Sequence, residues 1–148
     1  MASGVAVDDC AKNIYQLVKM HGKDKLRYAV LRISDDLKKI VVDDEKMGTS
    51  ERMDMEEPAH FMDVIRELPS DDGRYMIYDY PFEKEHRKCS KLILVMWVPS
   101  TIPIKKKMLY ASSKDALKKA CPDTAAEFQA DCADDLCHDE IVAKLVKI

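Results

Sequence analysis

The thiols and imidazoles are the first side chains to consider for chemistry. Cys132, Cys137 and His138 are close in sequence. They lack the paired CxxC spacing of structural zinc sites, so we predict no metal site and interpret the thiols as core or surface residues. The other histidines, at positions 21, 60 and 86, have no evident Ser, Cys or Asp partner. An enzyme that uses Cys137 and His138 is therefore the least favoured interpretation.

Phosphate binding and acid–base catalysis have equally little support. The four glycines, at positions 4, 22, 48 and 73, form neither a GxGxxG nor a GxxxxGK[ST] loop that could cradle a nucleotide. Carboxylates are abundant, but an Asp in a loop or at a helix start is usually a cap or a solvated charge. We therefore expect no cofactor and no catalytic residues.

The stretch KKKMLYASSKDALKK, residues 105–119, has more apolar residues than one side of a helix needs. At 3.6 residues per turn, the face suited to a core collects Leu109, Tyr110, Ser113, Ala116, Leu117 and Ala120. Met108 falls on the opposite face with Ile104, Ala111 and Ser112. A flexible Met ringed by lysines matches the apolar centre and charged rim of a protein interface, whereas a plain solvated lysine face is the alternative.

Hydrophobic periodicity predicts the elements that position this helix. We expect helices at 7–20, 58–68 and 103–121 and a closing helix after 136, with strands at 26–33, 38–42, 74–80 and 92–98. The apolar run 92–98 is typical of a central strand, so helices should cover both faces of the sheet. Segment 126–130, AEFQA, is ambiguous from its pattern. The whole chain, 1–148, is expected to be one domain.

Composition narrows the functional class. A chain of 148 residues with 47% hydrophobic residues suits a single globular domain. The net charge of -3 and the pI near 5.8 argue against nucleic-acid binding, and run 92–98 is too short to span a membrane. With no secretory signal and five irregularly spaced cysteines, we expect a cytosolic protein with reduced thiols. Segments 84–91 and 105–119 are lysine-rich, so an acidic partner should meet only part of the surface.

Three stretches resemble the actin-depolymerising factor/cofilin family: SGVAVDD (3–9), RYMIYDYPFE (74–83) and WVPSTIPIKKKMLYASSKDALKK (97–119). The resemblance implies a single ADF-homology domain of α/β (α+β type) class, a central mixed five- to six-stranded sheet sandwiched between helices, with AEFQA as an edge strand. It also implies binding to actin monomers and filament sides, with filament severing and depolymerisation and no covalent chemistry. We expect a monomeric cytoplasmic protein of the actin cytoskeleton.

Matched by motif, the resemblance places the surface for both actin forms on the N-terminal segment and the long helix. The residues are Ser3, Gly4, Val5, Lys105, Lys107, Met108, Ser113, Asp115, Lys118 and Lys119. Met108 is then expected to insert between actin subdomains while the lysines pair with actin carboxylates; Ser113 also lies on the face predicted for the core. Filament-specific contacts are expected from Lys88, Lys91, Lys144 and Lys147.

The resemblance also implies regulation at Ser3, where phosphate would add a charge of about -1.5 to -2 beside a surface for an acidic partner. Phosphoinositide headgroups should compete for the lysine face of 105–119. Two departures from the family pattern weaken the expected filament contact: Cys89, where some relatives carry a basic residue, and the acidic run CADDLCHDE (132–140). The basic nuclear-import cluster of vertebrate relatives is absent, so the sequence gives no basis for active nuclear import.

Two other binding functions stay open at this point. One is a coactosin-like protein that decorates filament sides without severing them. The other is a phosphoinositide-responsive adaptor for which actin is incidental.

Overall fold

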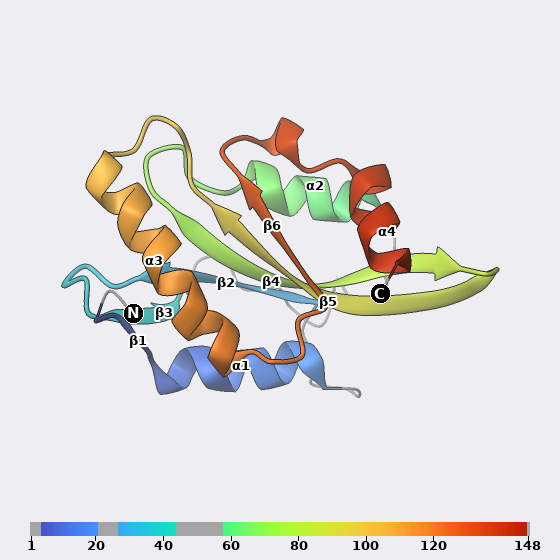
Figure 1. Ribbon diagram of the computed structural model, residues 1–148, viewed down its shortest axis with the longest axis horizontal. Helices are drawn as coiled ribbons and strands as arrows, with labels where there is room; N and C mark the ends of the chain where they lie inside the picture. The colour runs from blue at the N-terminus through green and yellow to red at the C-terminus, as the bar shows by residue number, and fades with distance from the viewer. Residues whose placement is uncertain (1–3, 21–26, 44–57, 148) are drawn as a thin grey trace.

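The computed structural model describes residues 4–20, 27–43 and 58–147, which form a mixed six-stranded sheet with helices on both faces (Figure 1). The strands are β1 (Ala6–Val7), β2 (Tyr28–Ile33), β3 (Lys39–Val42), β4 (Arg74–Lys84), β5 (Arg87–Trp97) and β6 (Ala126–Ala130). The helices are α1 (Asp9–Lys19), α2 (Pro58–Arg66), α3 (Ile104–Ala120) and α4 (His138–Val146), with a 3-10 turn η3 (Ala133–Asp135). The predicted fold class is confirmed.

The sheet has the strand order β1-β3-β2-β4-β5-β6. The pairs β1–β3 and β5–β6 are parallel and the others are antiparallel. The ambiguous segment AEFQA is β6, an edge strand in which Ala126 pairs with Ile93. Strand β1 was not predicted, because two residues are too few to show a periodic pattern. None of the helices in the described ranges is long and apolar enough to cross a membrane.

Two hydrophobic cores lie on opposite faces of the sheet. Because side chains alternate along a strand, Tyr75 and Ile77 of β4 point into the core with α1 and α3. Met76 and Tyr78 point the other way, into the core with α2 and α4. Figure 1 shows the same division, with α1 and α3 on one side of the sheet and α2 and α4 on the other. The central strands are therefore buried on both faces, as the apolar run 92–98 predicts.

Strands β4 and β5 are longer than predicted and form an arm, residues 81–91, that projects past the rest of the sheet (Figure 1). The pairing runs without a break from Arg74↔Trp97 to Lys84↔Arg87. Glu85 and His86 both have positive φ, 54° and 65°, as a tight two-residue hairpin turn requires. The arm is held by backbone pairing more than by burial, so its polar residues give no strand pattern. Residues 87–91 of the lysine-rich segment 84–91 thus lie on β5, which begins before the predicted strand 92–98.

Helix α3 is fixed to the sheet through the buried Tyr110. The backbone N–H of Ile33 donates to the Tyr110 hydroxyl oxygen at 3.1 Å, and the Tyr75 hydroxyl donates to the Tyr110 carbonyl. Burial raises the pKa of both phenols, so both stay neutral and keep their hydrogen-bonding roles. Gly73 leaves room for the ring, because a Cβ there would lie 2.7 Å from Tyr110 Cδ2.

The start of α3 differs in detail from the prediction. Pro103 is the N-cap residue, and its side chain makes no capping hydrogen bond. Thr101, two residues earlier, donates its hydroxyl to the Ser70 carbonyl at 2.7 Å. That bond ties the loop before α3 to the loop before β4.

We predict that Gly73→Ala lowers the free energy of unfolding by about 1 to 2 kcal/mol. The added methyl overpacks the Tyr110 ring, which costs about 1–3 kcal/mol, while the less flexible unfolded chain recovers about 0.4–1 kcal/mol. Urea unfolding measures the difference. Asp71→Ala, in the same exposed turn, is the control and should change stability little. A Gly73→Ala variant as stable as the parent would show that Tyr110 does not fix α3 as described.

Candidate protein-binding site

The outward face of α3 carries an apolar patch. Ile104 is 72% exposed and Met108 is 66% exposed, the two highest values among the large apolar side chains that the structure describes. Ala111 and Ser112 are exposed beside them. The predicted second patch is therefore confirmed. Full burial of each large apolar side chain against a partner would supply about 1.5–3 kcal/mol, so the patch is suited to a protein interface.

Lysines surround this patch, but they are not all equally available. Lys105 and Lys119 are exposed at the side chain. Lys107 donates its Nζ to the Ser100 carbonyl at 2.7 Å, and Lys118 Nζ lies 2.7 Å from Glu127 Oε1 of β6. Exposed pairs of this kind contribute little, so Lys118 can exchange Glu127 for a carboxylate on a partner at small cost.

A partly buried ionic network holds the first turn of α3 on β4. The carboxylate of Asp72 lies 2.8 Å from Lys106 Nζ and 2.7 Å from Arg74 Nη1, and Arg74 Nε lies 2.9 Å from Asp43 Oδ2. Burial raises the pKa of Asp72, but hydrogen bonds from Lys106, Arg74 and the Gly73 N–H outweigh it and lower the pKa below its ordinary value. The network therefore orients the exposed patch on a rigid base.

Two of the predicted contact residues have buried side chains. Val5 is 3% exposed in the core with α1 and α3, and Ser113 is 0% exposed, where it hydrogen-bonds the Tyr75 phenol. In this conformation neither side chain is available for direct contact with a partner. The core face predicted for Ser113 is confirmed, and both residues support the surface from below.

The other members of the predicted set reach the surface. Gly4 is exposed, with φ of 85°, a region that favours glycine, and it leads into β1, against which α3 packs. Asp115 is exposed on α3 between the lysines. Ser3 lies outside the described residues. The segment from Gly4 thus leads into a strand that contacts α3, and a surface shared with the exposed face of α3 stays a prediction.

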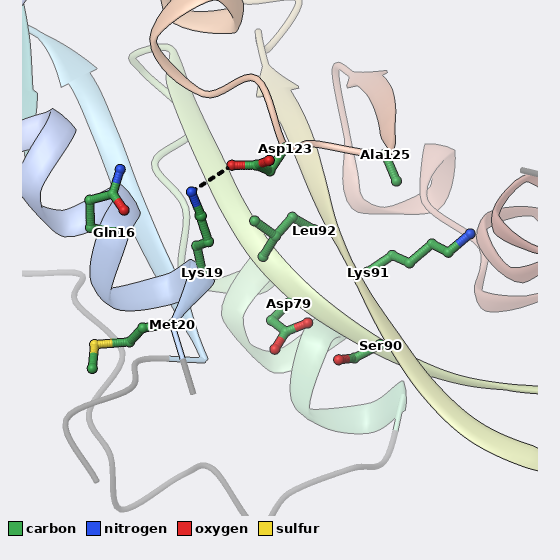
Figure 2. Close-up of a pocket in the computed structure, with 9 residues that line it drawn as sticks. All are labelled: Gln16, Lys19, Met20, Asp79, Ser90, Lys91, Leu92, Asp123 and Ala125. Atoms are coloured by element: carbon green, nitrogen blue, oxygen red, sulfur yellow. Dashed lines mark ion pairs between the residues drawn. The ribbon is translucent and has the colours of Figure 1, made fainter. Parts of the chain in front are cut away.

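The residues predicted for filament-specific contact lie on the arm and on α4. Lys88 is exposed on β5. Lys91 lines a cleft of about 660 Å³ between the end of α1 and β5, whose far wall carries the Lys19–Asp123 ion pair at 2.9 Å. Figure 2 shows the Lys91 side chain pointing away from that pair.

Helix α4 brings the other two lysines close to the root of the arm. Tyr80 of β4 hydrogen-bonds His138 Nδ1 at the start of α4, and Phe82 shares a core with Ile141. Lys144 donates its Nζ to the Glu127 carbonyl at 3.0 Å, and Lys147 is exposed just past α4. Figure 1 places the tip of the arm and α3 toward opposite ends of the molecule, whereas Lys118 of α3 and Lys144 of α4 both contact Glu127 of β6.

A groove of about 720 Å³ lies beside Met108, between α3 and the strands β5 and β6 with η3. It is lined by Met96, Val98, Ser100, Lys107, Met108, Ala111, Gln129, Asp131 and Asp135. The two aspartates were not predicted as site residues; the acidic run appeared only as a departure from the family pattern. Asp131, Cys132 and Asp135 also place three ligand-type atoms within 4.8 Å of one another, but all three residues are exposed and Cys137 and His138 are not among them.

The comparisons with known proteins agree with this geometry. The chain matches the family described as cofilin/tropomyosin-type actin-binding protein over residues 4–146. It belongs to the actin-depolymerising factor (ADF)/cofilin family. A cofilin of Yarrowia lipolytica is 33% identical over 145 residues, which are 97% of this chain and 87% of that protein.

Solved structures of ADF/cofilin proteins have the same fold. Actin depolymerization factor 2 of Plasmodium berghei matches with a TM-score of 0.80 and 26% identity over 100% of both chains. Coactosin from Entamoeba histolytica matches with a TM-score of 0.77 and 22% identity over 97% of this chain and 95% of that one. The second likeness concerns the fold alone.

In this ADF/cofilin chain the Asp72 network makes stability depend on pH. We predict that Asp72→Asn lowers the free energy of unfolding by about 1 kcal/mol at pH 7, since charge-assisted bonds to Lys106 and Arg74 become weaker neutral ones. The folded-state pKa lies below the ordinary 3.8, so the stabilisation is complete above that value and is lost as pH falls through the folded pKa. Urea unfolding between pH 7 and pH 2.5 should show the variant and the parent converging in acid.

Asp71→Asn is the matched control for that experiment. It removes one exposed carboxylate from the same turn and should leave the pH dependence of the parent intact. A constant difference between Asp72→Asn and the parent at all pH values would contradict the assigned network.

Proposed function

We propose that this chain binds actin monomers and filament sides through the exposed face of α3 and severs and depolymerises filaments. The observation that carries the proposal is the patch of Ile104 and Met108, exposed on a rigidly anchored helix and flanked by lysines, in a member of a family of actin-binding proteins. Its place of action would be the actin cytoskeleton of the cytoplasm.

The anchoring of α3 supports binding in a physical sense. Tyr110 and the Asp72 network hold the helix before a partner arrives, so little conformational freedom is lost on association. Met108 can then fill an apolar cleft on actin, while Lys105 and Lys119 pair with carboxylates at its edge. Electrostatic steering by the lysines favours an acidic partner, and phosphoinositide headgroups would compete for the same lysines.

The separate surface on the arm and α4 suits a second, filament-only contact. Lys88 and Lys147 are exposed there, and the tip of the arm lies toward the other end of the molecule from α3. A protein that holds one subunit by α3 and a neighbour by this surface gains effective concentration for the second contact. If the two sites fit best when the subunits are displaced, binding weakens the filament at that point, which is the proposed route to severing.

Sedimentation of actin filaments with increasing amounts of the protein tests the proposal. We expect the protein in the pellet and a growing amount of actin in the supernatant. Co-pelleting without actin release would replace it with a coactosin-like side-binding function, and no association in filament and monomer assays would overturn it.

Variants of α3 locate the contact in a titration of actin monomers. Met108→Ala should weaken monomer binding about tenfold or more, because a central apolar side chain is lost, and Lys105→Glu should weaken it through charge reversal. Met20→Ala is the matched control: it removes an exposed methionine at the end of α1 and should leave the affinity unchanged. Unaltered urea unfolding shows that the variants are folded. Full binding by Met108→Ala and Lys105→Glu would place the contact elsewhere.

We also propose that phosphorylation of Ser3 switches off actin binding. Ser3 precedes Gly4, and the segment leads into β1 beside α3, so added negative charge would oppose an acidic partner. Ser3→Glu should weaken monomer binding about threefold to tenfold in a fluorescence titration. Ser3→Ala, which adds no charge, is the control and should bind like the parent; equal affinity of the two variants would contradict the switch.

A further inference from the structure

The groove beside Met108 combines an apolar wall with an acidic end. Met108 and Ala111 of α3 and Val98, just past β5, line it on the apolar side. Asp131 and Asp135 line the far end, where β6 runs into η3. Such a lining is complementary to a long side chain with an apolar stem and a cationic head.

The two aspartates form a close pair of like charges. The backbone N–H of Asp131 donates to Asp135 Oδ2 at 3.0 Å, and both side chains are exposed. A hydrogen bond between the two side chains and the charge of Asp135 raise the pKa of Asp131, and Lys107 lowers it in part. The Lys107 ammonium is itself bound to the Ser100 carbonyl at 2.7 Å. An added cation at this end of the groove would therefore relieve repulsion between the two carboxylates.

We propose that the groove receives a lysine or arginine side chain of the actin subunit on which α3 docks, with the stem along Met108 and Val98 and the cationic head at Asp131 and Asp135. The inference rests on the proposed function and adds to it a charge requirement on the partner.

Under this proposal the two sides of α3 require groups of opposite charge on the partner. At 100° per residue, Lys107 and Ala111 face the groove, whereas Lys105 and Lys119 project from the opposite flank. Lys105 and Lys119 require acidic groups on the partner. Asp131 and Asp135 require a basic one, because the groove's own Lys107 is held by the Ser100 carbonyl. A helix with this charge distribution binds its partner in one orientation. Turning the helix by half a turn on the partner surface would bring like charges together.

The test compares three variants in a titration of fluorescently labelled actin monomers. Asp131→Asn with Asp135→Asn should weaken the Kd about threefold to tenfold and reduce its dependence on salt. The exposed Asp134→Asn, in the same 3-10 turn but not lining the groove, is the matched control and should bind like the parent. If urea unfolding shows that the double variant is not folded, the single variant Asp131→Asn is used in its place. That variant keeps the Asp135 carboxylate, which accepts the Asp131 N–H.

The outcomes separate this inference from the proposed function. Parent binding to actin with equal affinity for the Asp131 and Asp134 variants would overturn the groove assignment and leave the function standing; failure of the parent to bind actin would overturn both. Calorimetric titration of the protein with CaCl2 tests the alternative that the two aspartates bind a divalent cation. Calcium binding that is lost in the double variant, together with unchanged actin affinity, would assign the acidic pair to a metal and overturn the proposal.

Discussion

Tyr110 is the side chain on which the placement of α3 depends. Its ring fills the space above Gly73, its hydroxyl oxygen accepts the Ile33 N–H, and its carbonyl accepts the Tyr75 hydroxyl. The ring thus connects α3 to the centre of the sheet through contacts from two different strands. The face of α3 that carries its large exposed apolar residues contributes no burial to folding. The position of the helix therefore has to be fixed by contacts of its opposite, buried face.

The polar network at Asp72 complements this anchor. Tyr110 restrains the middle of α3, whereas the Asp72–Lys106 pair restrains its first turn. Together they remove rotation of the helix about its own axis, and rotation would turn Met108 away from a partner. The same logic explains why Ser113 is buried although the family resemblance places it in the contact set: a small hydroxyl fits the tight space against Tyr75 and lets α3 approach the sheet.

Much of this architecture could be predicted from the sequence. The apolar runs 26–33 and 92–98 predict strands and helical spacing predicts the two faces of 105–119, and the structure confirms them. The arm could not be predicted in the same way, since residues 81–91 are stabilised mainly by backbone pairing, which leaves no alternating pattern of apolar side chains. Strand β6 needed the resemblance, because AEFQA is short and pairs on one side only.

The candidate site also has one part that the sequence predicts and another that it does not. The exposed Met108 follows from helical spacing alone, and the structure confirms its exposure. The Asp72 network joins residues more than thirty positions apart, such as Asp72 with Lys106, and the groove brings Asp131 and Asp135 to Met108 from more than twenty positions away. No local pattern reports such contacts. The acidic run 132–140 is expected from the resemblance to weaken the filament contact, and that stays a prediction. In the structure Asp135 of this run lines the groove beside Met108, where its carboxylate would select a partner by charge under the proposed groove contact.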